Sequence, residues 1–279
     1  MTVTERWVQT RESPRIRVRC VIHEGPPEPA HTVVMVPGWL SSAEEKQTVA
    51  VELARHARVI VLEARGHGGS DRPRVPGAYS IEAFARELGV VIEAFGLRAG
   101  AYSVFAFCLA TGWTRALFND GFEPRPVGLV LATPAGRYRG AALLNATARA
   151  VPDPLLAGVQ RIATRAWIAL VPGERATIEQ TDRRVREQDG WVQRRIAATC
   201  SARMPFIPTP NLPQLWLVNE GDPFVEAPPM TDAVELWTIR SSHLWIDGRE
   251  REVADRVAEF LTRQGASIES TPAAVGQTP

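Results

Sequence analysis

The sequence predicts an α/β fold with a mostly parallel central sheet flanked by helices. Short unbroken apolar runs, typical of strands that are covered on both faces, alternate with segments of helical periodicity. Residues 134–210 have helical patterns and no strand candidate, so they are predicted to form a helical cap inserted into the sheet. The 279 residues, of which 45% are hydrophobic, suffice for one large domain with such an insertion.

The first half of the chain carries five strand candidates. The second of these candidate strands, at residues 16–22, alternates apolar and polar residues, with Ile16, Val18, Cys20 and Ile22 on one face. The third is an unbroken apolar run, as expected of a strand in the middle of a sheet. The five strands are predicted at residues 7–10, 16–22, 32–36, 58–62 and 103–107.

The helices and the later strands follow from the same patterns. Ser80 is predicted to cap a helix that runs to residue 95, and Asp247 is predicted to cap the final helix, which runs to residue 261. Two more helices are predicted at residues 43–55 and directly after Cys108, and the later strands at residues 127–132, 214–218 and 234–239.

The predicted organisation is a single α/β core that the cap interrupts. Residues 154–170 of the cap carry an apolar stripe at helical spacing. The C-terminal residues are small and polar, and they are predicted to be disordered. The predicted boundaries are 1–133 and 211–264 for the core, 134–210 for the cap and 265–279 for the disordered tail.

Composition and charge argue against several classes of partner. The formal net charge is +1 and the arginines are spread out and matched by acids, so we expect no nucleic-acid partner. No apolar run is long enough to cross a bilayer and the first residues do not resemble a secretory signal, so we expect a cytoplasmic protein with no membrane association. Cys20, Cys108 and Cys200 form no close pair, which argues against disulfides and a zinc site; no metal or cofactor is expected.

Cys108 stands where an apolar strand pattern stops and a helical pattern begins. A nucleophile on such a tight corner is exposed at the edge of the sheet, and the helix N-terminus behind it offers free N–H groups to a thiolate and to an oxyanion. The residues two before and two after it are Ala106 and Ala110, small enough for the turn but not the usual glycines. A lone cysteine among apolar residues is more often a buried hydrophobe, as we expect for Cys20 and Cys200.

Five short motifs in order resemble the α/β-hydrolase superfamily across nearly the whole chain, apart from the cap and the two ends. In that family the nucleophile comes first, the acid follows a late strand and the histidine follows the last strand. The resemblance therefore implies the triad Cys108, Asp222 and His243. The motifs are Val-Pro-Gly-Trp at 36–39, Arg-Gly-His-Gly-Gly-Ser-Asp at 65–71, Ala-Phe-Cys-Leu-Ala at 106–110, Glu-Gly-Asp-Pro-Phe-Val at 220–225 and Ser-His-Leu at 242–244.

The chemistry of these three residue types fits the implied triad. A thiol attacks as its thiolate and needs a nearby base, and a carboxylate holds the imidazole of that base in the useful tautomer. Asp222 could instead only start a turn with the proline that follows it, and Glu220 and Glu226 are rival acids. The alternative for His243 is a surface or core histidine with no catalytic role. Of the other histidines, His67 is interpreted as structural, and His23, His31 and His56 fall at strand edges or a helix end.

The resemblance also implies an oxyanion hole made of the backbone N–H groups of Leu109 and Trp39. The loop that carries Trp39 has Pro37-Gly38 where the family usually has His-Gly. Tryptophans near the predicted site and in the cap favour a bulky apolar acyl group, although plain core packing explains them equally well. The four assigned to a substrate pocket are Trp113, Trp167, Trp191 and Trp245.

The elbow at Cys108 is similar to the Gly-x-Cys-x-Gly elbow of dienelactone hydrolases, which also use cysteine. An acyl group on this thiol would be a thioester, so transfer to an amine, alcohol or thiol competes with hydrolysis. The predicted activity is that of an esterase, thioesterase or acyltransferase acting on a small-molecule ester, lactone or thioester, a carrier-linked thioester included. The alternative is an isomerase, cyclase, lyase or ligand-binding scaffold in which Cys108 is not a nucleophile. The oligomeric state stays open.

Overall fold

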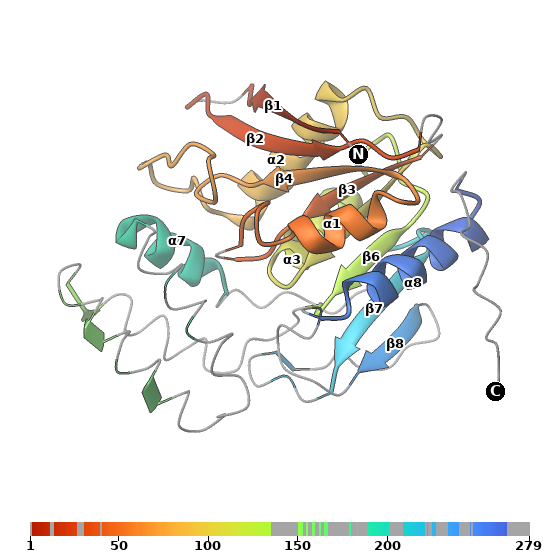
Figure 1. Cartoon of the computed structure of the whole chain (residues 1–279). Helices are drawn as coiled ribbons and strands as arrows, with labels where there is room; N and C mark the ends of the chain where they lie inside the picture. The colour runs from red at the N-terminus through yellow and green to blue at the C-terminus, as the bar shows by residue number, and fades with distance from the viewer. Residues whose placement is uncertain are drawn as a thin grey trace.

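The computed structural model of the protein has a single sheet with helices on both faces (Figure 1). Within the described residues, no helix is long and apolar enough to cross a membrane. The structure describes residues 2–11, 14–26, 31–39, 41–134, 150–152, 189–200, 209–220, 222, 225–226, 234–239, 246 and 248–266, together with isolated positions between 155 and 183.

Eight strands of the described chain form this sheet in the order β1-β2-β4-β3-β5-β6-β7-β8. β1 and β2 are antiparallel to their neighbours, and every pair from β4 to β8 is parallel. The carboxyl ends of the parallel strands therefore meet at one edge of the sheet. The strands are β1 (Val3–Gln9), β2 (Arg17–His23), β3 (Thr32–Val36), β4 (Arg58–Glu63), β5 (Tyr102–Phe107), β6 (Leu129–Ala132), β7 (Gln214–Asn219) and β8 (Glu235–Ile239).

Two hydrophobic cores lie on the two faces of the sheet. One core contains the apolar sides of α2 (Ile81–Ala94) and α3 (Ala110–Asn119), and the other contains those of α1 (Gln47–Leu53) and α8 (Glu250–Arg263) (Figure 1). Buried β-branched and aliphatic side chains of the central strands alternate between the two cores, as the period of a strand requires. This layered arrangement confirms the predicted fold class.

The main differences from the sequence-based elements lie at their ends. β1 begins at Val3, earlier than the predicted residue 7, because its pairing with β2 rather than its own weak apolar pattern determines the strand. α1 begins only at Gln47, after a turn over residues 43–46. The prediction that Asp247 caps the final helix is wrong: the N-cap is Arg249, which follows Gly248 in a left-handed conformation (φ +86°).

One helix of the predicted cap region, α7 (Gly190–Cys200), packs against the core. Val192 and Ile196 are buried there, and a Cβ on Gly66 would lie 2.8 Å from a methyl of Val192. Arg74 also pairs with Asp189 just before the helix. Most of the other residues of the predicted cap, and the tail from residue 267, lie outside the described residues, so the predicted domain boundaries remain a prediction.

Candidate active site

Cys108 forms a strained corner between β5 and α3. Its backbone has φ +48°, a left-handed conformation that is uncommon for any residue other than glycine. Its N–H donates to the carbonyl oxygen of Ala132 at the end of β6 (2.8 Å), and its carbonyl oxygen accepts from the N–H of Thr111 (3.1 Å) and from the Thr111 hydroxyl (2.7 Å). These bonds hold the strained residue in place, as in the sharp strand-to-helix turn that exposes a nucleophile.

The two cysteine side chains that the structure describes differ in accessibility. Cys108 is partly exposed at the edge of the sheet, whereas Cys20 is fully buried in the core. Burial, with the negative charge of Glu87 adding to it, raises the pKa of the Cys20 thiol to about 12. Cys20 is therefore an unreactive core residue, as predicted, while Cys108 is open to a reagent.

The loop after β3 lies directly against this corner. A Cβ built on Gly38 would lie 2.9 Å from the carbonyl oxygen of Phe107 and 3.1 Å from the Cβ of Cys108. Only glycine allows this close approach of two backbones. Trp39 follows Gly38 in the chain, and Leu109, the N-cap residue of α3, follows Cys108. The residue before Trp39 thus contacts Cys108, and the role of Trp39 and Leu109 in an oxyanion hole stays a prediction.

Asp222 lies beyond the end of β7, at the same edge of the sheet as Cys108 and two strands away. It is 5% exposed, whereas Glu220 is exposed and Glu226 is partly buried. Its Oδ1 accepts a hydrogen bond from the N–H of Val225 (3.0 Å), so the side chain does stabilise a turn. A carboxylate has about four acceptor positions, so accepting this bond does not exclude a role as the acid of a triad, which stays a prediction.

His243 lies outside the described residues, as do Trp167 and Trp245. The strand before it, β8, ends at Ile239, which pairs with Asn219 of β7. The last described strand therefore ends at the same edge of the sheet as Cys108 and Asp222, and the place of His243 stays a prediction.

The two described tryptophans of the predicted pocket have different surroundings. Trp113 is 1% exposed and stacks on Phe84 with ring centroids 4.2 Å apart, so its environment is that of a core residue. Trp191 on α7 is partly buried, with its ring edge-on to Tyr79 at 6.1 Å and the guanidinium of Arg195 over it at 5.1 Å. The core-packing interpretation thus holds for Trp113, and the pocket role of Trp191 stays a prediction.

Buried histidines outside the site have structural surroundings. His67 is buried, its Nδ1 is 3.0 Å from the carbonyl oxygen of Arg65, and burial lowers its pKa to about 4 despite backbone hydrogen bonds that oppose this. His31 lies with its Nε2 2.9 Å from the Ser103 hydroxyl, and burial lowers its pKa to about 4 as well. Across the part of the chain that the structure describes, no group of three or more His, Cys, Asp or Glu side chains could hold a metal ion.

One polar residue near the site was not singled out from the sequence. Glu63 ends β4 with its side chain fully buried, and it accepts a hydrogen bond from Ala43 in the loop that follows β3. A charged residue at the end of an otherwise apolar strand, followed by a glycine-rich loop, was the available signal.

The sheet order, the helices on both faces and the strained corner after β5 together define the α/β-hydrolase fold. The family model described as "alpha/beta hydrolase fold" matches residues 31–126. No curated protein matches the chain in sequence.

Solved structures of this fold cover nearly the whole chain. A thermophilic esterase from Thermogutta terrifontis has 18% identity and a TM-score of 0.73, covering 94% of this chain and 99% of its own. An enol-lactonase from Burkholderia xenovorans has 16% identity and a TM-score of 0.70, covering 91% and 99%. The bottromycin epimerase BotH has 17% identity and a TM-score of 0.69, covering 92% and 99%. At these identities the likeness shows the shared fold.

Proposed function

We propose that the protein is an acyl enzyme that uses Cys108 as its nucleophile on an ester, lactone or thioester. The observation that carries this proposal is the left-handed conformation of Cys108 at the corner between β5 and α3, with the Gly38 backbone against it. A thiol held in this way faces the substrate close to two backbone N–H donors, those of Leu109 and Trp39. The esterase and the enol-lactonase among the structural neighbours use the same fold and support this class of reaction.

Acylation requires one base and one oxyanion site. In the proposed step, His243 takes the proton of the Cys108 thiol, the sulfur attacks the substrate carbonyl carbon, and the oxyanion accepts hydrogen bonds from the N–H groups of Leu109 and Trp39. The carbon–heteroatom bond then breaks, and the leaving alcohol or thiol takes the proton from His243. Asp222 orients the imidazole and stabilises its charged form.

Deacylation decides whether the enzyme hydrolyses or transfers. A thioester on Cys108 is attacked by water, or by an amine, alcohol or thiol, with His243 now taking the proton of the attacking group. The regenerated thiol then receives that proton as the carbon–sulfur bond breaks. The fold supports both outcomes, and an assay with and without a nucleophilic acceptor distinguishes hydrolysis from transfer.

The direct test of this proposal is the modification of Cys108 followed by intact-mass spectrometry. With p-nitrophenyl acetate or a low dose of iodoacetamide at neutral pH, we expect fast modification at Cys108, no modification of the buried Cys20, and loss of the adduct in C108A. H243A should slow acylation about 10²–10⁴-fold, the usual contribution of a general base. If Cys108 reacts no faster than an accessible thiol in the unfolded chain, or if H243A reacts at the wild-type rate, the proposed triad is wrong.

A second candidate is an isomerase or epimerase in which Cys108 forms no covalent bond. The observation that favours it is the likeness to the bottromycin epimerase, together with alanines where the elbow usually has glycines. In this case His243 would act as a base on a carbon acid, and activity would tolerate C108A but not H243A. The same pair of variants therefore separates the two candidates.

A further inference from the structure

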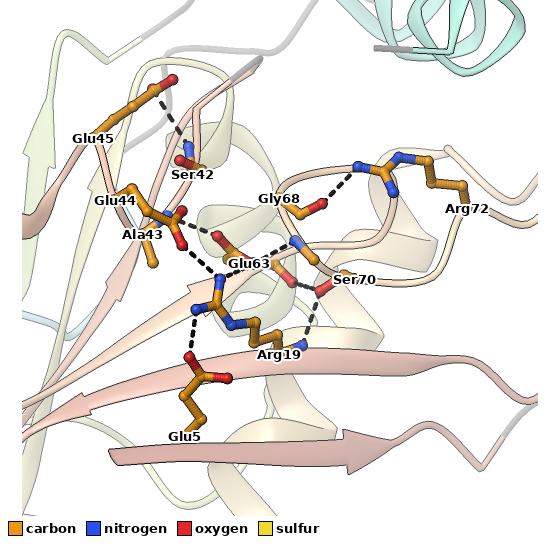
Figure 2. A network of polar contacts seen from close by, with 11 residues as sticks. Glu5, Arg19, Ser42, Ala43, Glu44, Glu45, Glu63, Gly68, Ser70 and Arg72 are labelled. Atoms are coloured by element: carbon orange, nitrogen blue, oxygen red, sulfur yellow. Dashed lines mark hydrogen bonds and ion pairs between the residues drawn. The ribbon is translucent and has the colours of Figure 1, made fainter. Parts of the chain in front are cut away.

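Glu63 links two loops at the edge of the sheet that carries the site (Figure 2). Its Oε1 accepts a hydrogen bond from the N–H of Ala43 in the loop after β3 (2.9 Å). Its Oε2 accepts from the N–H of Gly69 in the loop after β4 (2.7 Å) and from Nη1 of Arg19 (3.3 Å). A fully buried carboxylate with three such donors is a fixed anchor for both loops.

The surroundings of this carboxylate are shaped to hold it. A Cβ on Gly68, which has φ +46°, would lie 2.1 Å from the carboxyl carbon of Glu63, so only glycine fits there. The hydroxyl of Ser70 donates to the Glu63 carbonyl oxygen (2.6 Å) and accepts from the N–H of Arg19 (2.8 Å). The main chain and the side chain of Glu63 are therefore both tied to their neighbours.

Arg19 brings the N-terminal hairpin into the same network. It lies opposite Glu63 in the antiparallel pairing of β2 with β4, and its guanidinium also binds Glu44 (2.7 Å) and Glu5 (2.6 Å) (Figure 2). Burial acts to raise the pKa of Glu44, but hydrogen bonds from Arg19, from its own backbone and from Ser42 outweigh it and lower that pKa to about 2. The loop after β3 is thus held at two consecutive residues, Ala43 and Glu44.

The loop after β3, which Glu63 and Arg19 hold in place, also contains Gly38, whose backbone contacts Cys108. The N–H of Ser41 donates to the carbonyl oxygen of Gly38 (3.2 Å), which closes a turn from Gly38 to Ser41, two residues before Ala43. At the other end of this turn, the Gly38 backbone contacts the Phe107–Cys108 corner. Displacement of Ala43 would therefore move the Trp39 amide relative to the thiol.

We propose that Glu63 and Arg19 are positioning residues that hold the Trp39 N–H of the oxyanion hole in place beside Cys108. This inference rests on the proposed function, because it concerns the oxyanion that forms when Cys108 attacks a carbonyl. Glu63 does not touch the substrate; it acts through Ala43 and the turn. In E63Q the side-chain oxygen is expected to keep the two donors of Oε2, Gly69 and Arg19, so the amide nitrogen would face the N–H of Ala43 and the loop after β3 would lose its anchor.

The experiment compares two reactions of the same thiol, measured by intact mass at Cys108. Acylation by p-nitrophenyl acetate passes through an oxyanion, whereas alkylation by iodoacetamide does not. We expect E63Q to slow acylation about 10–100-fold, the effect of a misplaced donor, and to leave alkylation at the wild-type rate. E24Q is the matched control, because Glu24 pairs with Arg58 at the opposite end of β4 (3.2 Å) and should change neither rate.

Circular dichroism and thermal melting show whether each variant is folded. If E63Q does not fold, E63D takes its place: it keeps the charge beside Arg19 but withdraws the carboxylate by one methylene, so acylation should again fall selectively. A folded E63Q or E63D that acylates at the wild-type rate overturns the inference and leaves the proposed function standing. An equal fall in acylation and alkylation also overturns it, since Glu63 would then only maintain the local fold. A wild-type protein that is not acylated at Cys108 overturns the proposed function itself, and the inference with it.

Discussion

Cys108 and Gly38 have complementary backbone requirements. A residue other than glycine in the left-handed region costs about 1–3 kcal/mol, and it persists only where surrounding bonds hold it, as the hydrogen bonds to Ala132 and from Thr111 do here. Position 38 has a different requirement: a side chain there would collide with the corner, so only glycine lets the backbone come this close to Cys108. The corner at Cys108 therefore depends on the close packing of two backbone segments.

G38A tests this close approach at the scale of one residue. The added methyl would lie 2.9 Å from the Phe107 carbonyl oxygen, so the loop must move away from Cys108. We expect acylation of Cys108 to slow about 10–100-fold, because the donor on this loop is displaced. Stopped-flow release of p-nitrophenol measures the rate.

The control for G38A is the same substitution in open space. A Cβ on Gly158 would meet nothing within 4 Å, so G158A should acylate as the wild type does. Wild-type acylation in a folded G38A would show that the loop after β3 does not provide an oxyanion donor.

At the scale of an element, a buried ion pair fastens the loop after β4 to α2. The carboxylate of Glu87 on α2 accepts from Nε of Arg65 (2.8 Å) and from its N–H (2.9 Å), and Nη1 of Arg65 donates to the carbonyl oxygen of Ala78 (3.1 Å). Both side chains are buried. Burial raises the pKa of Glu87, although the Arg65 charge and its hydrogen bonds act against this. α7 packs over the same loop at Gly66.

R65M should destabilise the whole protein strongly. Methionine fills much of the space but leaves the Glu87 carboxylate buried without its cation, which typically costs about 3–5 kcal/mol in the free energy of unfolding. Urea denaturation followed by circular dichroism measures this. R251M removes only an exposed contact with Asp255 and should cost less than about 1 kcal/mol. Equal costs in the two variants would contradict a structural role for the Arg65 pair.

At the scale of the whole molecule, burial of ionisable groups links stability to pH. His31 and His67 lie in the interior with pKa values lowered to about 4, mainly by burial, whereas in the unfolded chain they titrate near 6.5. Below about pH 6.5 the unfolded chain takes up protons that the folded protein does not bind. The free energy of unfolding should therefore fall as the pH drops from about 6.5 to about 4.

Urea denaturation at several pH values checks this expectation. Each histidine should contribute a slope of up to about 1.4 kcal/mol per pH unit within the window. H31Q combined with H67Q should flatten the slope between pH 6.5 and 4.5 while leaving the loss at lower pH, where Glu44 and other carboxylates with lowered pKa values take up protons. A slope unchanged in the double variant would mean that other groups cause the acid destabilisation.

Much of the fold and part of the site were predictable from local patterns. The strand that ends just before Cys108, the helix that follows it and the helix cap formed by Ser80 depend on neighbours in sequence, and the structure has all three. The interpretation of Trp113 as a pocket residue was weaker, because helical spacing places it on an apolar face without saying what that face meets. It meets Phe84 of α2.

The sequence by itself determined the order and type of the elements and the corner on which Cys108 stands, because apolar periodicity, turn residues and caps act over a few residues. Only the tertiary structure decided which distant groups meet. Arg19, Ala43 and Glu63 are brought together because β2 and β3 pair with the two sides of β4. No periodic pattern in the sequence predicts the hydrogen bonds between these residues. Each bond depends on the register of neighbouring strands and not on residues that are close in sequence.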